Sequence, residues 1–255
     1  MILNPLEQFS IFSIFNIFEK TSLSTYTALS FVNSNFFLLV NILLFLFLVK
    51  LLNLTKSSKL IPNRFQYILS SIYKFVLNIL VENVGPSAKK YFPWIFVIFI
   101  TLFIVNISGM VPFSFTVTSH LIVTFWLGLS IFIGITIIGF ATHGIKYFNL
   151  FLPAGVPLAL APALVVIELL SYFIRVISLS VRLFANMMSG HILLKVLLGF
   201  AWTMMVTNYV LYTMHFIPLG IVFLLIFLEI GVALIQAYVF TILVCIYLND
   251  ALNLH

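Results

Sequence analysis

Charged residues are scarce in this chain of 255 residues: Asp, Glu, Lys and Arg make up 7% of it, and hydrophobic residues make up 63%. Soluble domains carry roughly a quarter charged residues, so the composition excludes an ordinary soluble protein and indicates a polytopic membrane protein. The single cysteine, Cys245, excludes an internal disulfide framework and a multi-cysteine metal site. The sequence has no HExxH motif and no glycine-rich phosphate loop. We therefore expect no cofactor, no bound metal, no nucleic-acid partner and no catalytic centre within the chain.

The N-terminus lacks the features of a targeting segment. Met1 to Lys20 contains Glu7 and Glu19 and has no basic region, which is typical of neither a secretory signal nor a transit peptide. Synthesis in the same compartment as the target membrane explains this most simply. The 29 phenylalanines resemble the amino-acid drift of an AT-rich genome, which suits an organelle.

Long apolar runs divide the chain into membrane segments, which we expect to form a single all-α membrane domain over residues 1–255. The expected parts are an outer N-terminal segment over 1–35, a first membrane helix over 36–54, a helical hairpin over 94–145 and a long helical pair over 160–255. About five membrane-embedded helices result.

Residues 60–85 predict a further helix of a different kind. Apolar residues recur there at helical spacing, and polar residues follow every four positions on another face: Gln66, Ser70, Lys74, Asn78 and Glu82. This amphipathic pattern predicts a helix that lies in the membrane interface. Residues 50–90 also hold seven of the twelve Lys and Arg residues, which places this region on the cytoplasmic or matrix side and the N-terminus outside.

The last two helices are expected to be long and strongly tilted. Prolines are absent over 163–217 and over 219–255, so Pro218 marks the one sharp break. A single helix over 219–255 would be about 55 Å long, nearly twice the hydrocarbon thickness of about 30 Å.

A polar face runs along the first of these two helices. Its members recur every three or four residues: Glu168, Ser171, Arg175, Ser178, Arg182, Asn186 and Ser189. Arg182 is the most informative, because a guanidinium keeps its charge and costs from about 3 to above 10 kcal/mol when unpaired in lipid. No acidic residue lies one helical turn from Arg182, so its partner must come from elsewhere.

Other ionisable residues lie on either side of Arg182. Glu168 and Asp250 fall toward the inner ends of their helices, whereas His191 and Glu229 fall toward the outer ends. Two separated groups with a fixed cation between them predict two offset aqueous half-paths for protons.

Structural alternatives exist for several of these residues. Snorkelling or helix pairing explains Arg175 as well as a functional role does, and Lys195 is expected to snorkel. Glu229 could be a protonated packing residue, although Gln236 follows it on the same face. The alternative function is that of a secondary transporter or proton-pump subunit that uses Arg182 and Glu229 as its substrate or proton site.

The chain resembles subunit a of the F-type rotary ATP synthase in its mitochondrial form. The resemblance rests on five stretches, of which the fourth is highly specific: Pro5–Phe9 (PLEQF), Pro112–His120 (PFSFTVTSH), Pro153–Pro157 (PAGVP), Ser178–His191 (SLSVRLFANMMSGH) and Tyr247–His255 (YLNDALNLH).

This resemblance implies a non-catalytic proton-channel stator of the Fo sector in the mitochondrial inner membrane. The implied partners are a rotating ring of c subunits, each with one essential carboxylate, together with the peripheral stalk, other Fo subunits and membrane lipid. By their positions in the motifs, the site residues are the essential arginine Arg182, the nearby polar Asn186 and Gln236, the outer pair His191 and Glu229, and the inner acids Glu168 and Asp250. Arg175, on the same helical face as Arg182, joins this candidate set.

Overall fold

The computed structural model describes residues 9–11, 13–16, 30–54, 64–111, 115–151, 161–207 and 214–253. Six α-helices are present in these ranges: α1 (Asn33–Leu54), α2 (Arg64–Val84), α3 (Phe92–Gly109), α4 (Leu121–His143), α5 (Ala161–Thr207) and α7 (Phe216–Leu252). Three 3-10 helices connect some of them: η3 (Pro86–Tyr91), η4 (Val117–Ser119) and η5 (Gly144–Phe151). The prediction of an all-α membrane protein is confirmed.

Five helical segments are long and apolar enough to cross a membrane: Gln66–Val84, Ala88–Gly109, Leu121–Phe148, Pro162–Val206 and Phe216–Leu252. The first of them, in α2, is the one expected to lie in the interface, and its mean hydropathy of 1.2 is the lowest of the five. Its interfacial position stays a prediction. In α1, the apolar part over Asn33–Phe47 is shorter than a full span.

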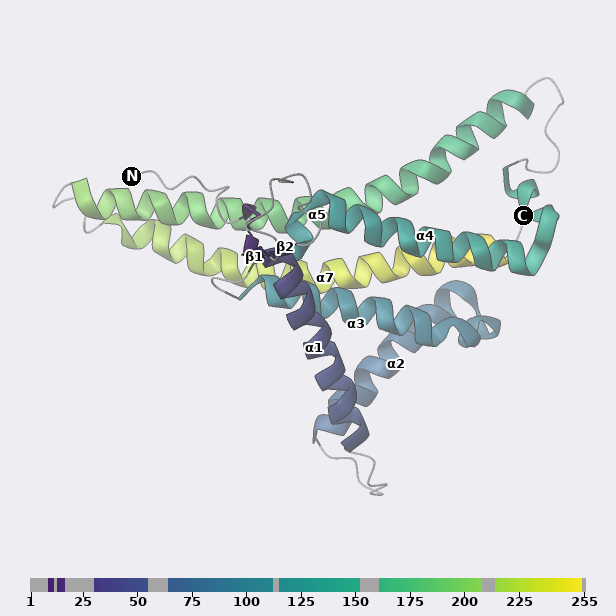
Figure 1. The fold of residues 1–255 in the computed structure, drawn as a ribbon, viewed down its shortest axis with the longest axis horizontal. Coiled ribbons are helices and arrows are strands. Elements are labelled where there is room, and N and C mark those ends of the chain that lie inside the picture. Colours follow the sequence, from purple (N-terminus) through teal and green to yellow (C-terminus); the bar gives the residue numbers. More distant parts are fainter. Residues whose placement is uncertain are drawn as a thin grey trace. The chain divides into compact units, whose positions relative to one another are not determined.

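The last two helices are very long, as expected. In Figure 1, α5 and α7 are drawn as continuous helices of 47 and 37 residues. At 1.5 Å per residue they measure about 70 and 55 Å, so both exceed the thickness of the hydrocarbon layer. Pro218 lies in the first turn of α7, where a missing backbone N–H costs no helical hydrogen bond. The break between the two helices therefore precedes Pro218.

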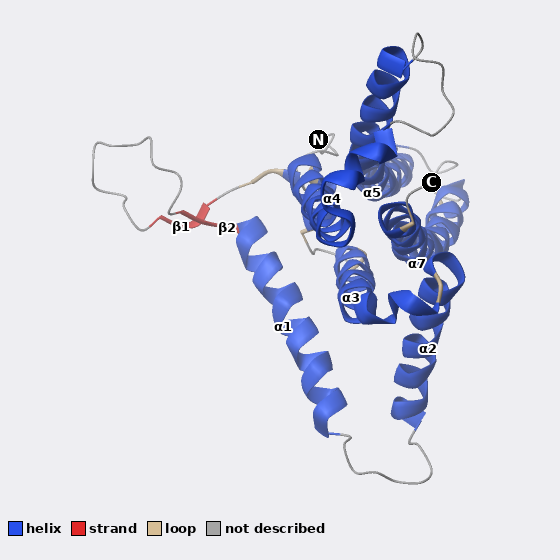
Figure 2. Cartoon of the chain, turned by 90° about the vertical axis from the view of Figure 1, so that its right-hand side faces the viewer, coloured by secondary structure: helices blue, strands red, loops and turns tan. Residues whose placement is uncertain are grey.

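A two-stranded antiparallel sheet, absent from the sequence-based prediction, lies in the N-terminal segment. Strand β1 (Ser13–Asn16) pairs with β2 (Ser30–Val32), and both are the red arrows of Figure 2. Strands of four and three residues are too short to give a readable alternation of apolar and polar side chains. The sequence therefore predicts an outer N-terminal segment over 1–35 without indicating these strands.

The chain divides into two compact units, and each is built from three separate segments. One unit holds Met1–Asn53, Phe103–His120 and Phe184–Ile235; the other holds Leu54–Leu102, Leu121–Leu183 and Gln236–His255. Helices α3, α5 and α7 each contribute residues to both units. The single membrane domain expected from the sequence stays a prediction.

Within the second unit, α4 packs closely against its neighbours through small residues. A Cβ atom added at Gly128 would lie 2.5 Å from the Ser180 hydroxyl of α5, and one at Gly139 would overlap the ring of Tyr147. Small residues of this kind let membrane helices approach each other. The ring of His143 at the end of α4 hydrogen-bonds the carbonyl of Leu252 through Nε2 at 2.9 Å. These contacts hold α4 against α5, against η5 and against the C-terminal end of α7.

Candidate functional site

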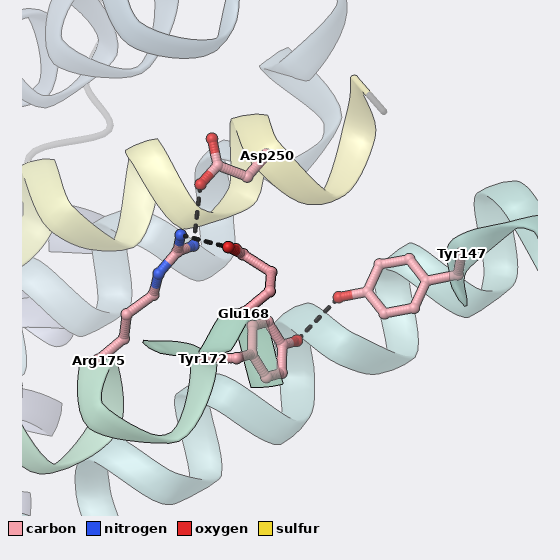
Figure 3. Close-up of polar contacts among 5 residues, drawn as sticks. All are labelled: Tyr147, Glu168, Tyr172, Arg175 and Asp250. Atoms are coloured by element: carbon pink, nitrogen blue, oxygen red, sulfur yellow. Dashed lines mark hydrogen bonds and ion pairs between the residues drawn. The ribbon is translucent and has the colours of Figure 1, made fainter. Parts of the chain in front are cut away.

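Three charged side chains of the second unit form an inner cluster: Glu168, Arg175 and Asp250 (Figure 3). The Arg175 guanidinium donates a hydrogen bond from Nη1 to Asp250 Oδ2 at 3.0 Å, and its Nη2 lies 3.8 Å from Glu168 Oε1. Glu168 and Arg175 share one face of α5, and Asp250 comes from the last turn of α7. The three side chains keep 27–34% of their surface exposed, so they meet both solvent and each other. The structure thus joins the two predicted inner acids through one arginine.

Two side chains of the first unit form an outer pair, His191 on α5 and Glu229 on α7. His191 Nε2 lies 3.7 Å from Glu229 Oε1, too far for a direct hydrogen bond and near enough for transfer through one water. Neither this nitrogen nor the two carboxylate oxygens has a hydrogen-bond partner among the described residues, and all three atoms are buried. Buried polar atoms in this state bind water or exchange protons.

The Glu229 carboxylate lies directly against the backbone of α5. A Cβ atom added at Gly190 would be 2.6 Å from Glu229 Oε1, so only glycine leaves room for the side chain there. One turn beyond Glu229, the Ala233 carbonyl accepts a hydrogen bond from Asn106 Nδ2 of α3 at 3.4 Å. Asn106 is fully buried, and its Oδ1 has no hydrogen-bond partner in the described part of the chain.

Arg182 behaves differently from Arg175, although both lie on the same face of α5. Its side chain is exposed, and it takes part in none of the ion pairs formed between described residues. Of the two polar residues expected near it, Gln236 is 4% exposed and Asn186 is half-buried. The expectation that no acid of this chain pairs with Arg182 agrees with this arrangement.

Sequence reasoning did not single out Asn106, Gly190, Tyr147 and Tyr172. The Tyr147 and Tyr172 hydroxyls lie 2.8 Å apart beside the inner cluster (Figure 3). Tyr172 lies one turn from Arg175 on α5, and Asn106 is an amide within an apolar helix, so both positions offered a signal. Nothing in the sequence indicates the close approach at Gly190.

Metal ions in proteins are held by groups of His, Cys, Asp and Glu side chains. In the ranges that the structure describes, no group of three or more His, Cys, Asp and Glu side chains is arranged to hold a metal ion.

The fold and the two clusters define a multi-pass membrane protein whose two longest helices carry ionisable side chains suited to proton transfer. A family model described as ATP synthase A chain matches residues 35–249. ATP synthase subunit a of Marchantia polymorpha is 50% identical over 258 residues, covering 100% of both chains. The proteins of the same name from Chondrus crispus and Brassica napus are 49% and 52% identical and cover 100% and 89% of this chain, and 98% and 89% of their own.

The chain therefore belongs to the ATP synthase subunit a family. It is a proton-translocating stator subunit of the Fo sector, and a non-catalytic part of its enzyme complex. The resemblance drawn from the five sequence stretches is confirmed, and the transporter alternative is not supported. The roles of individual residues within this function need a separate argument.

Proposed function

We propose that Arg182 faces the carboxylate of a c subunit in the rotating ring, with one half-path for protons on either side of it. The observation that carries this proposal is the contrast between two arginines of one helix face. Arg175 is neutralised within the chain by two carboxylates, whereas Arg182 is exposed and forms no ion pair with any described carboxylate. An arginine left unpaired in a membrane is too costly to retain without an anionic partner.

The electrostatics of Arg182 explain how rotation is coupled to proton transfer. A ring carboxylate beside the guanidinium is favoured in its ionised form, and the same carboxylate in hydrocarbon is favoured as the neutral acid. Each ring subunit must therefore release one proton before it passes Arg182 and take up one proton after it. Because the guanidinium cannot lose its proton, it also opposes direct proton passage between the half-paths.

The outer half-path runs through Glu229 and His191. Glu229 is buried and His191 is half-buried, and their facing atoms have the 3.7 Å separation that a shared water can bridge. Glutamate and imidazole both exchange protons readily in partly buried sites, so the pair can hand protons to and from the ring. Asn106, which holds the carbonyl of Ala233 on α7, is a positioning residue for this pair.

The inner half-path runs through Glu168 and Asp250. Both are partly exposed, as groups near an aqueous exit should be. The Arg175 guanidinium stays protonated and cannot relay a proton, so we assign it the role of holding the two carboxylates near each other. Asn186 on α5, one helical turn from Arg182, and Gln236 on α7 are the polar side chains that we assign to the surroundings of the guanidinium.

The partners follow from the same roles. A stator subunit whose Arg182 forms no ion pair with a described carboxylate requires the c ring. It requires the peripheral stalk and other Fo subunits to stop it from turning with the ring. The relatives come from land plants and a red alga, and together with the mitochondrial-type motifs this supports the mitochondrial inner membrane as the location.

Disulfide crosslinking in the assembled complex tests the position of the ring. Cys245 is the chain's only cysteine and is buried, so Cys245→Ala gives a cysteine-free background. Cysteines at Ser178 and Ala185, exposed positions one turn from Arg182 on its face, should each crosslink to a cysteine beside the ring carboxylate. Ile177 is 50% exposed and lies about 140° around the helix from Arg182, so Ile177→Cys is the matched control and should not crosslink.

Arg182→Ala should abolish proton-driven ATP synthesis in vesicles, and Arg182→Lys should do so too, because lysine keeps the charge but loses the planar fork and moves the cation. Lys74→Ala removes an exposed cation from α2 and should leave synthesis unchanged. Normal synthesis by an assembled Arg182→Ala complex, or equal crosslinking at Ile177 and Ser178, would contradict the proposal.

A further inference from the structure

A pair of tyrosine hydroxyls beside the inner cluster has no role in the proposed function. The hydroxyl oxygens of Tyr147 on η5 and Tyr172 on α5 lie 2.8 Å apart, and either can be the donor (Figure 3). Tyr147 is 2% exposed and Tyr172 is half-buried. A hydrogen bond between two hydroxyls uses one of their two protons, so the pair can donate its second proton to a third group.

Packing fixes where these hydroxyls point. The Tyr147 ring fills the space above Gly139, where any Cβ would overlap it, and its centroid is 4.7 Å from that of Phe140. The Tyr172 ring packs on Phe132 with centroids 4.3 Å apart. This packing keeps the hydroxyl groups of both rings in one place, which is what a binding site for a small polar ligand requires.

A cavity of about 10 Å³ lies between the tyrosine pair and the inner cluster. Its lining consists of Phe132, Ile135, Tyr147, Tyr172, Arg175, Tyr247, Asp250 and Ala251. This volume is about that of one water molecule, and a buried water needs two to four polar partners. Hydroxyl, guanidinium and carboxylate groups in the lining supply that number. Glu168 contacts Arg175 but does not line the cavity.

Asp250 has the capacity to accept a bond from such a water. Its Oδ2 accepts from Arg175 Nη1 at 3.0 Å, and an ionised carboxylate offers about four acceptor positions in total. The Arg175 guanidinium is held in turn over the ring of Tyr247, 5.3 Å from its centroid. The carboxylate is therefore oriented from one side by Arg175, and the cavity lies between it and the tyrosines.

We propose that this cavity binds one water molecule, which hydrogen-bonds both the tyrosine pair and the Asp250 carboxylate, and that Tyr147 and Tyr172 are positioning residues for Asp250. This inference rests on the proposed inner half-path. The water donates to Asp250 and stabilises the carboxylate in the orientation from which it exchanges protons. Glu168 receives no such support, so the two inner acids are not equivalent.

Removal of one hydroxyl tests the link. Tyr172→Phe and Tyr147→Phe keep the ring packing and delete the polar atom. In the wild type each should slow ATP-driven proton pumping in vesicles by no more than Asp250→Asn does. In the Glu168→Gln background, where Asp250 is the remaining inner acid, each should slow it about three- to tenfold per assembled complex, the size expected for the loss of one hydrogen bond to a neutral water. Tyr67 is 67% exposed, so Tyr67→Phe is the matched control and should pump at the wild-type rate.

A pair of double variants separates a positioning role from general destabilisation. Because the water contacts Asp250 and not Glu168, Tyr172→Phe should have no further effect in the Asp250→Ala background and its full effect in the Glu168→Gln background. Equal losses in both backgrounds would overturn the inference. Failure of the inner half-path itself gives a different result: the Glu168→Gln, Asp250→Asn double variant would then pump normally.

Direct observation of the water completes the test. A cryo-EM map of the wild-type complex should show one density peak within about 3 Å of a tyrosine hydroxyl and of an Asp250 oxygen. The peak should be lost in Tyr172→Phe. An unoccupied cavity in the wild-type map would overturn the inference even if the variants fail to assemble.

Discussion

Replacing Gly190 by alanine would test whether the spacing between α5 and the Glu229 carboxylate controls proton exchange in the outer half-path. The added methyl carbon would lie 2.6 Å from Glu229 Oε1 and 3.0 Å from its Cδ. Ordinary contact begins at 3.4 Å, so the oxygen must retreat by at least 3.4 − 2.6 = 0.8 Å. The retreat carries it away from α5, the helix that also bears His191, and should lengthen the 3.7 Å separation of the pair.

Gly190→Ala should slow proton translocation and leave the stability of the complex nearly unchanged. Alanine gains about 1 kcal/mol over glycine in a helix, and moving the end of a flexible side chain off its preferred rotamer costs a similar amount. The folded complex should therefore keep nearly its wild-type stability. Misplacing a reacting group by about 1 Å costs up to about 100-fold in rate, so we expect proton translocation to fall by about 10- to 100-fold.

The assay is ATP-driven proton pumping and proton-driven ATP synthesis in vesicles, with the amount of assembled complex measured on native gels. Gly199→Ala is the matched control on the same helix, because nothing lies within 4 Å of a Cβ added there. It should assemble and pump like the wild type.

Two results would refute the reasoning. If Gly190→Ala pumped as fast as Gly199→Ala, the position of the carboxylate would not limit proton exchange. Complete loss of assembly in Gly190→Ala would contradict the stability estimate.

Three further experiments test the remaining groups. Glu229→Gln keeps the shape of the side chain but cannot exchange protons, so pumping should fall at least as far as the loss of about 10- to 100-fold expected for Gly190→Ala in a fully assembled complex, and wild-type pumping would reject its role. Glu168→Gln and Asp250→Asn should each slow proton pumping only mildly in the same assay, whereas the double variant should slow it severely. Small effects that simply add would argue against a shared path. Burial lowers the pKa of His120 below its ordinary 6.5, so the folded protein favours the neutral imidazole. The stability of the folded state that this provides is complete above pH 6.5 and is lost as the pH falls toward the folded-state pKa. Thermal inactivation of the complex should accelerate below about pH 6.5, and less so in His120→Phe, which keeps the ring that stacks on Phe115 at 5.0 Å.

The long helices and the polar face of α5 could be predicted because both depend on local rules. Apolar runs of spanning length need no tertiary information, and residues spaced by three or four share a helix face wherever the helix lies. The absence of an acid one turn from Arg182 is equally local, and it led to the expectation of a partner in another chain. The grouping of His191 with Glu229 followed from their positions toward the outer ends of their helices, and the resemblance to a family added the role of an outer pair.

The contacts that give the site its geometry depend on segments far apart in the sequence. Arg175 and Asp250 are separated by 75 positions, and several acids could have been chosen for Arg175 on charge alone. Tyr147 reaches Tyr172 only because η5 turns back onto α5. The close approach of Glu229 to Gly190 depends on the distance between two helix axes, which no periodicity encodes.

The two arginines of α5 show why residue type alone does not define a role in this family. Both carry a permanent charge, and they lie seven positions apart on one face. Arg175 has its charge satisfied by Glu168 and Asp250, so removing it should disturb those acids and leave the face toward the ring intact. Arg182 has its charge presented outward, so its full electrostatic effect is available to a passing carboxylate. A fixed charge can act on a moving partner only if its own chain does not neutralise it, which is why the exposure of Arg182 matters as much as its charge.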